Sequence, residues 1–87
     1  MTAVARGTMV GFGASSDGAL DALYVLPESA GHGIGACLLW ELPQARHLWV
    51  LVANARGRCF YERNGWRATE LLRPAYGDVM EIQYQRG

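Results

Sequence analysis

The sequence predicts a mixed α/β fold, an α+β type in which about six strands form one mixed sheet with two helices. Three observations support this prediction: a strand–helix–strand succession in the middle of the chain, strand-like segments at both ends, and glycine-containing turns between them. The 87 residues suit one small domain, residues 1–87. With 51% hydrophobic and 18% charged residues, the chain is not expected to be disordered.

The first segments are predicted to be short strands. Thr2–Val4 and Thr8–Ala14 are of β type, and Arg6–Gly7 between them is typical of a hairpin turn. Ser15–Gly18 is a second turn signal. The apolar run Ala19–Leu26 follows and is expected to form a strand covered on both faces.

The central segments predict a crossover unit. From Gly33 onward, apolar residues follow helical spacing, and Pro43 stops or kinks that helix after Leu42. The apolar run His47–Ala53 is a further strand. Strand, helix and strand in this order predict two parallel strands with a right-handed connection.

The last third predicts a helix and two strands. Asn54 is a good N-cap for a helix through about Arg63, which Asn64–Gly65 would end. Trp66–Leu71 and Val79–Gln85 alternate in part between apolar and polar residues, which predicts two strands around a loop, Arg73–Asp78.

Composition excludes several classes of function. Basic and acidic residues are 8 each, so no positive field would recruit nucleic acid. No apolar run approaches the roughly 18 residues that a membrane span needs. Cys37 and Cys59 form no CxxC pair and lie in apolar segments, which favours buried free thiols and a cytoplasmic, reducing compartment.

Residues 31–36, with the sequence GHGIGA, are the strongest functional signal. They follow a strand that ends at Pro27 and open a helix, so small residues and free N–H groups would bind a diphosphate. Glycine turns also serve simple strand-to-helix packing, which remains the alternative. The spacing departs from the Rossmann pattern, and a P-loop requires a lysine that this chain lacks.

Two segments resemble the GNAT superfamily of N-acetyltransferases. Residues 23–39 (LYVLPESAGHGIGACLL) are similar to its acetyl-CoA segment, a strand followed by an Arg/Gln-x-x-Gly-x-Gly/Ala loop and a helix. The strand LWVL, Asn54 and residues 60–66 (FYERNGW) are similar to its second signature. The resemblance implies a GNAT-like acyl-CoA N-acyltransferase fold that lacks the family's N-terminal strand and following two helices.

The resemblance also implies acetyl-CoA as cosubstrate and suggests where it binds. The backbone of Leu23, Tyr24 and Val25 would pair with the pantetheine arm and the acetyl carbonyl, and Asn54 would meet a pantetheine amide. The pyrophosphate would lie on the loop and the helix start, which comprise Ala30, Gly31, His32, Gly33, Ile34, Gly35 and Ala36.

The resemblance places two catalytic candidates. Tyr61 would be the general acid that protonates the departing CoA thiolate, and Asp21 would take the amine's proton, often through water. Each has a structural alternative: Tyr61 would pack under the sheet, Asp21 would be solvated, and Asn54 would only cap its helix. Trp40, Trp49 and Trp66 are expected in the core or an interface.

The loop departs from the family pattern in its charge. Ala30, His32 and Ala36 stand where basic or amide side chains are usual, so backbone dipoles would meet most of the phosphate charge. Gly57 stands where the family usually has Ala, which costs the second helix about 1 kcal/mol.

The leading hypothesis is an N-acetyltransferase that moves an acetyl group from acetyl-CoA to a primary amine of a small molecule or peptide. Attack would be direct, in a ternary complex without metal. The alternatives are a non-catalytic or vestigial CoA-binding module and an interaction domain that has kept the fold. A homodimer is also expected, with Val79–Gln85 as the contact, because the hydrophobic content leaves apolar surface to cover.

Overall fold

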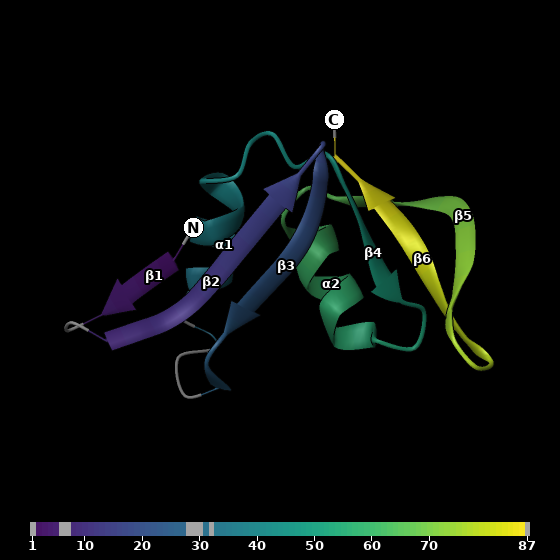
Figure 1. Ribbon diagram of the computed structural model, residues 1–87, viewed down its shortest axis with the longest axis horizontal. Coiled ribbons are helices and arrows are strands. Elements are labelled where there is room, and N and C mark those ends of the chain that lie inside the picture. The colour runs from purple at the N-terminus through teal and green to yellow at the C-terminus, as the bar shows by residue number, and fades with distance from the viewer. Residues whose placement is uncertain (1, 6–7, 28–30, 32, 87) are drawn as a thin grey trace. The chain divides into compact units, whose positions relative to one another are not determined.

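A computed structural model describes residues 2–5, 8–27, 31 and 33–86, and the chain divides into two compact units, Met1–Ala45 and Arg46–Gly87. Each unit is described by itself below (Figure 1). Six strands and two helices occur among the described residues, which confirms the predicted mixed α/β fold class. The two strands of the predicted crossover fall in different units. The single domain stays a prediction.

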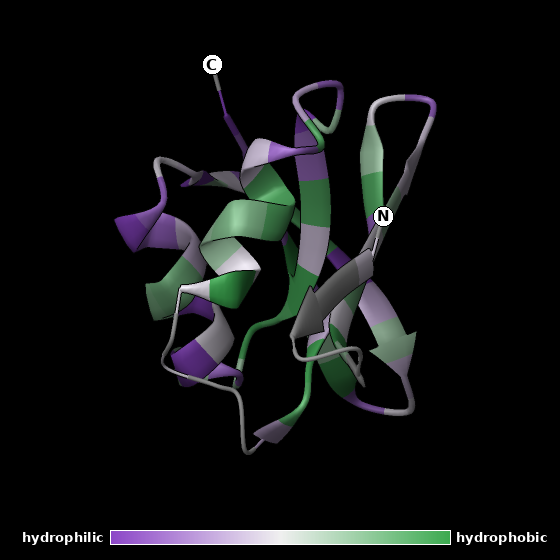
Figure 2. Cartoon of the chain, turned by 90° about the vertical axis from the view of Figure 1, so that its left-hand side faces the viewer, coloured by the Kyte–Doolittle hydropathy of each residue, from purple (hydrophilic) through white to green (hydrophobic). Residues whose placement is uncertain are grey.

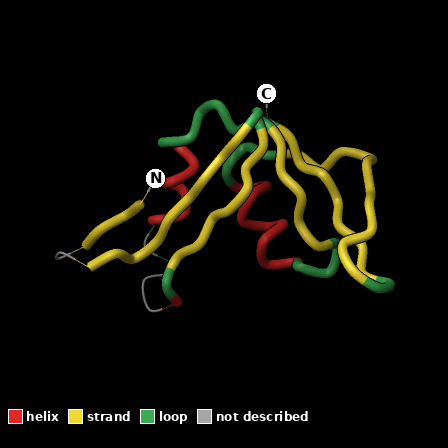
Figure 3. Tube along the Cα trace, in the orientation of Figure 1, coloured by secondary structure: helices red, strands yellow, loops and turns green. Residues whose placement is uncertain are grey.

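The N-terminal unit contains three antiparallel strands and one helix. Strands β1 (Thr2–Ala5), β2 (Thr8–Ser16) and β3 (Ala19–Val25) lie in the order β1-β2-β3. Helix α1 (Ile34–Trp40) follows β3, as Figure 3 shows. Apolar side chains from β2, α1 and the segment after α1 make the core of this unit: Val10, Leu38, Leu39, Leu42 and Ala45.

Local sequence signals predicted the ends of these elements to within about two residues. The β2–β3 turn is only Asp17–Gly18, both with positive φ (49° and 82°), so β2 extends two residues further than predicted. Helix α1 ends at Trp40 with Glu41 as its C-cap, two residues before the predicted end at Leu42. Leu42 is nevertheless buried, because the chain continues against the same core. The predicted turn at Arg6–Gly7 lies outside the described residues.

The C-terminal unit contains three antiparallel strands and one helix. It contains β4 (His47–Leu51), α2 (Ala55–Arg63), β5 (Arg67–Tyr76) and β6 (Val79–Gln85), with the strands in the order β4-β6-β5. The last strand therefore pairs on both edges, with Tyr84 opposite Leu48 on one side and Ala68 on the other. The most buried side chains of this unit are Leu48, Val50, Trp66 and Tyr84.

Strand β5 corrects one sequence prediction. It runs through Pro74 to Tyr76, so the predicted loop Arg73–Asp78 shrinks to the turn Gly77–Asp78. Within the C-terminal unit β5 pairs only with β6, and proline is tolerated on such an edge because its missing N–H removes no ladder bond on the unpaired side. The register is irregular on both sides of Leu72–Pro74.

The central place of β6 bears on the predicted dimer contact. Both backbone edges of Val79–Gln85 are occupied, so pairing between protomers through this strand would require that β4 or β5 be displaced. A dimer through this strand is therefore expected to form by exchange of the strand between protomers.

Two further predictions concern burial. Cys37 and Cys59 are free and exposed, so the expectation of buried thiols is wrong. Trp66 is 1% exposed and confirms its core assignment, whereas Trp40 is 83% exposed at the end of α1 and lies outside the core.

Helix α1 is rich in hydrophobic residues and α2 in hydrophilic ones (Figure 2). Among the described residues no helix is long and apolar enough to cross a membrane.

Candidate functional site

The glycine turn between β3 and α1 has a backbone conformation that favours glycine. Gly31 and Gly33 have φ values of 86° and 77°, in the left-handed region that other residues rarely adopt. A Cβ added at either position would meet nothing within 4 Å, so backbone conformation and not lack of space requires glycine. Ala30 and His32, two predicted cofactor-binding residues, lie outside the described residues.

The first turn of α1 has amides without an intrahelical acceptor. Gly33 is the N-cap and makes no side-chain capping bond, and the first intrahelical bond runs from the Cys37 amide to the Gly33 carbonyl, 3.0 Å. The N–H groups of Ile34, Gly35 and Ala36 precede that bond and have no intrahelical acceptor. No acidic side chain lies in this turn, so nothing in it repels an anion from these amides.

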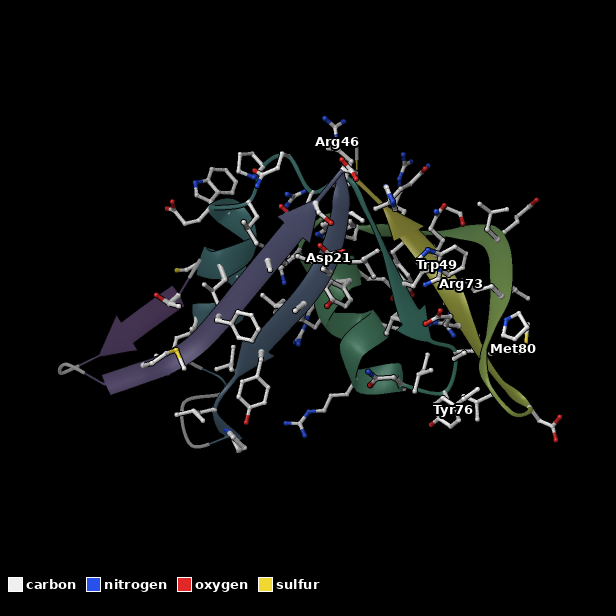
Figure 4. All side chains as sticks on the ribbon, viewed as in Figure 1. Asp21, Arg46, Trp49, Arg73, Tyr76 and Met80 are labelled. Atoms are coloured by element: carbon white, nitrogen blue, oxygen red, sulfur yellow. The ribbon has the colours of Figure 1, made fainter. Side chains whose placement is uncertain are left out.

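Strand β3 carries the other candidate residues of the N-terminal unit. Leu23, Tyr24 and Val25 pair with Gly13, Phe12 and Gly11 of β2. Asp21 is exposed on the same strand, and its Oδ2 accepts a hydrogen bond of 2.6 Å from the Ser16 hydroxyl (Figure 4). That contact ties the carboxylate to the end of β2 and leaves it open to solvent, so both interpretations of Asp21 remain.

Asn54 caps α2 as predicted. Its Oδ1 accepts a hydrogen bond from the Gly57 amide, 3.0 Å. A Cβ at Gly57 would lie 2.5 Å from Asn54 Nδ2 and 3.0 Å from its Cγ. Gly57 therefore has a local role that helix propensity alone does not reveal: it lets the cap side chain fold over the first turn.

Tyr61 lies on α2 and packs inside the C-terminal unit. Its ring is 6.1 Å from the Trp66 ring and 6.4 Å from the Tyr84 ring, centroid to centroid. Burial raises the pKa of its phenol above the ordinary value. Tyr61 is therefore protonated at neutral pH, as a general acid must be, and it also makes the packing contacts of the alternative interpretation.

Sequence reasoning missed a polar cluster around Tyr84. The Tyr84 hydroxyl accepts a hydrogen bond from Arg58 Nε and donates one to Glu62 Oε2. The spacing of Arg58 and Glu62, one turn apart on α2, was the available signal. Another missed contact joins Arg73, which stacks on Trp49 with its Cζ 4.1 Å from the ring centroid and forms an ion pair with Glu81 (Figure 4).

The candidate residues fall into two groups by unit. The N-terminal unit holds Asp21, the β3 residues and the glycine turn, and the C-terminal unit holds Asn54 and Tyr61 on α2. In the part of the chain that the structure describes, no group of three or more His, Cys, Asp and Glu residues could hold a metal ion.

Comparisons with known proteins agree with this fold. The sequence model of the family described as "Acetyltransferase (GNAT) domain" matches residues 2–68. No curated protein sequence matches the chain.

Three solved structures are similar to this chain. YjaB from Escherichia coli, in its apo form, has 25% identity, a TM-score of 0.77 and coverage of 92% of this chain and 58% of its own. A protein assigned to the GNAT acetyltransferases from Desulfovibrio desulfuricans has 27% identity and a TM-score of 0.74, and the match covers 95% of this chain and 64% of that protein. PaiA N-acetyltransferase from Thermoplasma acidophilum, in complex with coenzyme A, has 25% identity and a TM-score of 0.73, and the match covers 97% of this chain and 58% of PaiA. The chain thus spans less than two thirds of these proteins.

Proposed function

Since this chain belongs to the GNAT acetyltransferase family, we propose that it transfers an acetyl group from acetyl-CoA to a primary amine by direct attack in a ternary complex. The observation that carries the proposal is the turn at Gly31 and Gly33, with its positive φ values and the following amides that have no intrahelical acceptor. Such an arrangement binds a diphosphate through backbone N–H groups.

The N-terminal unit would hold the cofactor. The amides of Ile34, Gly35 and Ala36, together with the glycine turn from Ala30 to Gly33, would bind the pyrophosphate of CoA. We assign the backbone of Leu23–Val25 on β3 to the pantetheine amides. With no basic side chain assigned to the phosphates, backbone dipoles would supply the favourable field.

The C-terminal unit would supply the acid. The amine nitrogen attacks the thioester carbonyl carbon, a C–N bond forms and the C–S bond breaks. Tyr61 gives its proton to the leaving thiolate, and the raised pKa keeps the phenol protonated until that charge develops. The proton released by the amine passes to Asp21, through water. Asn54 would hold a pantetheine amide through its side-chain NH2 group, since its Oδ1 is engaged by the helix cap.

A second candidate function is a CoA-binding or interaction module without catalysis. The packing of Tyr61 against Trp66 and Tyr84 favours it, because these contacts give the residue a structural role that needs no reaction.

The proposal includes a cytoplasmic homodimer that accepts a small-molecule or peptide amine. Two exposed free cysteines support a reducing compartment. Exposed apolar side chains, among them Trp40, Leu71 and Leu72, support self-association.

Isothermal titration with CoA tests the cofactor site. We expect Gly33→Val to abolish the heat of binding, because a β-branched residue strains a turn that requires positive φ at this position. Gly77→Val is the matched control: Gly77 also has positive φ (52°) and open space, but it lies in the β5–β6 turn. If the two variants bind CoA equally well, the site assignment is wrong.

Mass spectrometry of acetylated amine products tests catalysis. Tyr61→Phe removes only the hydroxyl and keeps the ring contacts, so we expect lower turnover with CoA affinity nearly unchanged. Full turnover in this variant would end the general-acid assignment. Lower turnover together with loss of the folded state would support the packing interpretation.

A further inference from the structure

A polar bridge joins α2 to the buried strand β6. The Tyr84 side chain is 0% exposed, and its hydroxyl accepts from Arg58 Nε at 3.0 Å and donates to Glu62 Oε2 at 2.5 Å. The hydroxyl thus accepts a hydrogen bond from the Arg58 cation and donates its single proton to the Glu62 carboxylate, so both hydrogen bonds are charge-assisted. Arg58 and Glu62 project from the same face of α2.

Arg58 also reaches the turn that leads into α2. Its Nη1 donates to the Val52 carbonyl at 3.0 Å, and the Val52 amide donates to the Met80 carbonyl of β6 at 3.0 Å. Val52 comes two residues before Asn54, and the Arg58 amide donates to the Asn54 carbonyl at 3.0 Å. A single guanidinium therefore joins β6, α2 and the segment that carries Asn54.

Tyr61 is adjacent to the same bridge. It lies between Arg58 and Glu62 along α2, and its ring contacts the Tyr84 ring at 6.4 Å between centroids. The two candidate residues of this unit, Asn54 at the N-terminus of α2 and Tyr61 near its C-terminus, are thus each one contact away from the bridge.

Apolar packing alone does not explain how α2 is held. None of its nine residues, all of which the structure describes, is fully buried. Contacts between apolar groups are non-directional and tolerate rotation or sliding of a helix. Hydrogen bonds have narrow distance and angle limits, so two charge-assisted bonds from successive turns fix both the rotation of α2 and its position along its axis.

We propose that Arg58 and Tyr84 are positioning residues for acetyl transfer: their bridge sets α2 so that Asn54 and Tyr61 are presented together to CoA. The inference rests on the function proposed above. Glu62 completes the bridge as an acceptor, a role that an amide oxygen also fills.

The test compares kcat and CoA affinity among folded variants, with circular dichroism as the check of folding. The probes are acetyl-CoA with ethanolamine or with a tripeptide that has a free N-terminus. We expect Tyr84→Phe, which removes one oxygen atom, and Arg58→Met each to lower kcat about tenfold, because small misplacements of an acid act strongly on the transition state. The Kd for CoA should rise less, since most cofactor contacts are assigned to the other unit.

Three variants separate positioning from mere stability. Arg58→Lys can keep one of the two bonds and should restore part of kcat, and Glu62→Gln should keep most of it. Arg63→Met removes an exposed arginine from the same helix and should leave kcat and Kd unchanged. A bridge that only stabilises the fold would lower the urea midpoint and leave kcat of the folded variants at the wild-type value.

The outcomes distinguish the two proposals. A wild-type chain that acetylates a probe while Tyr84→Phe and Arg58→Met keep its kcat overturns the positioning role alone. A wild-type chain that binds no CoA and acetylates neither probe overturns the proposed function, and the positioning role with it. If Arg58→Met does not fold, Tyr84→Phe decides.

Discussion

The substitution Gly57→Ala tests whether helix propensity or the contact with the Asn54 side chain decides its effect on stability. Helix propensity predicts that Gly57→Ala stabilises α2 by about 1 kcal/mol. The structure predicts otherwise, because the new Cβ would lie 2.5 Å from Asn54 Nδ2 and 3.2 Å from its Oδ1. Real Cβ atoms do not approach other atoms at 2.5 Å, so the Asn54 side chain must leave its place and release the Gly57 amide.

The magnitude follows from two terms. Loss of an Asn cap costs about 1 kcal/mol, with a range of roughly 0.5 to 2 kcal/mol, and the gain in propensity is about 1 kcal/mol. In the wild-type chain the two terms offset, so Gly57→Ala should change the free energy of unfolding by less than about 0.5 kcal/mol. In an Asn54→Ala chain no cap remains to be lost, and the same substitution should stabilise by the full ~1 kcal/mol. The coupling between the two sites is therefore about 1 kcal/mol.

The assay is urea unfolding of four proteins: wild type, both single variants and the double variant. Far-UV circular dichroism follows the transition, and equal m values are required for the comparison. If Gly57→Ala stabilises the wild type and the Asn54→Ala chain by the same amount, the effects are additive and the steric argument is wrong. The wild type and Gly57→Ala are also titrated with CoA, and we expect weaker binding in the variant because Asn54 is displaced.

The remaining predictions concern pH, charge and association. Burial raises the pKa of Tyr61 and of Tyr84, so the stability they contribute is complete below the unfolded value of about 10 and is lost as pH rises through the raised folded values. The urea midpoint should thus fall above pH 10, and less in Tyr84→Phe; a flat profile contradicts the assignment. Ala30→Arg should tighten CoA binding, with a gain that shrinks as salt is added, and unchanged affinity at low ionic strength would place the phosphates elsewhere. Light scattering at micromolar concentration should give a dimer mass, and a monomer mass that persists as concentration rises would exclude the dimer.

Local sequence signals predicted most elements because their causes are local. Asn54 caps the Gly57 amide in the first turn of its own helix, and Gly31 and Gly33 adopt a backbone conformation that other residues avoid. The glycine turn and the start of α1 were therefore predictable without knowledge of the rest of the chain. Strand β5 was not, because Pro74 signals a loop unless the strand is known to lie at an edge.

By itself the sequence determined the fold class, the order of the elements and the family resemblance; the residues assigned to acetyl-CoA stay a prediction. The tertiary structure alone decided that β6 lies between β4 and β5, that Trp40 and both cysteines are exposed, and that Gly57 makes room for the Asn54 cap. It also decided that Arg58 and Glu62 meet Tyr84, more than twenty residues away along the chain. Periodicity and turn residues act over a few neighbours, whereas burial and hydrogen bonds between distant residues depend on which segments pack together.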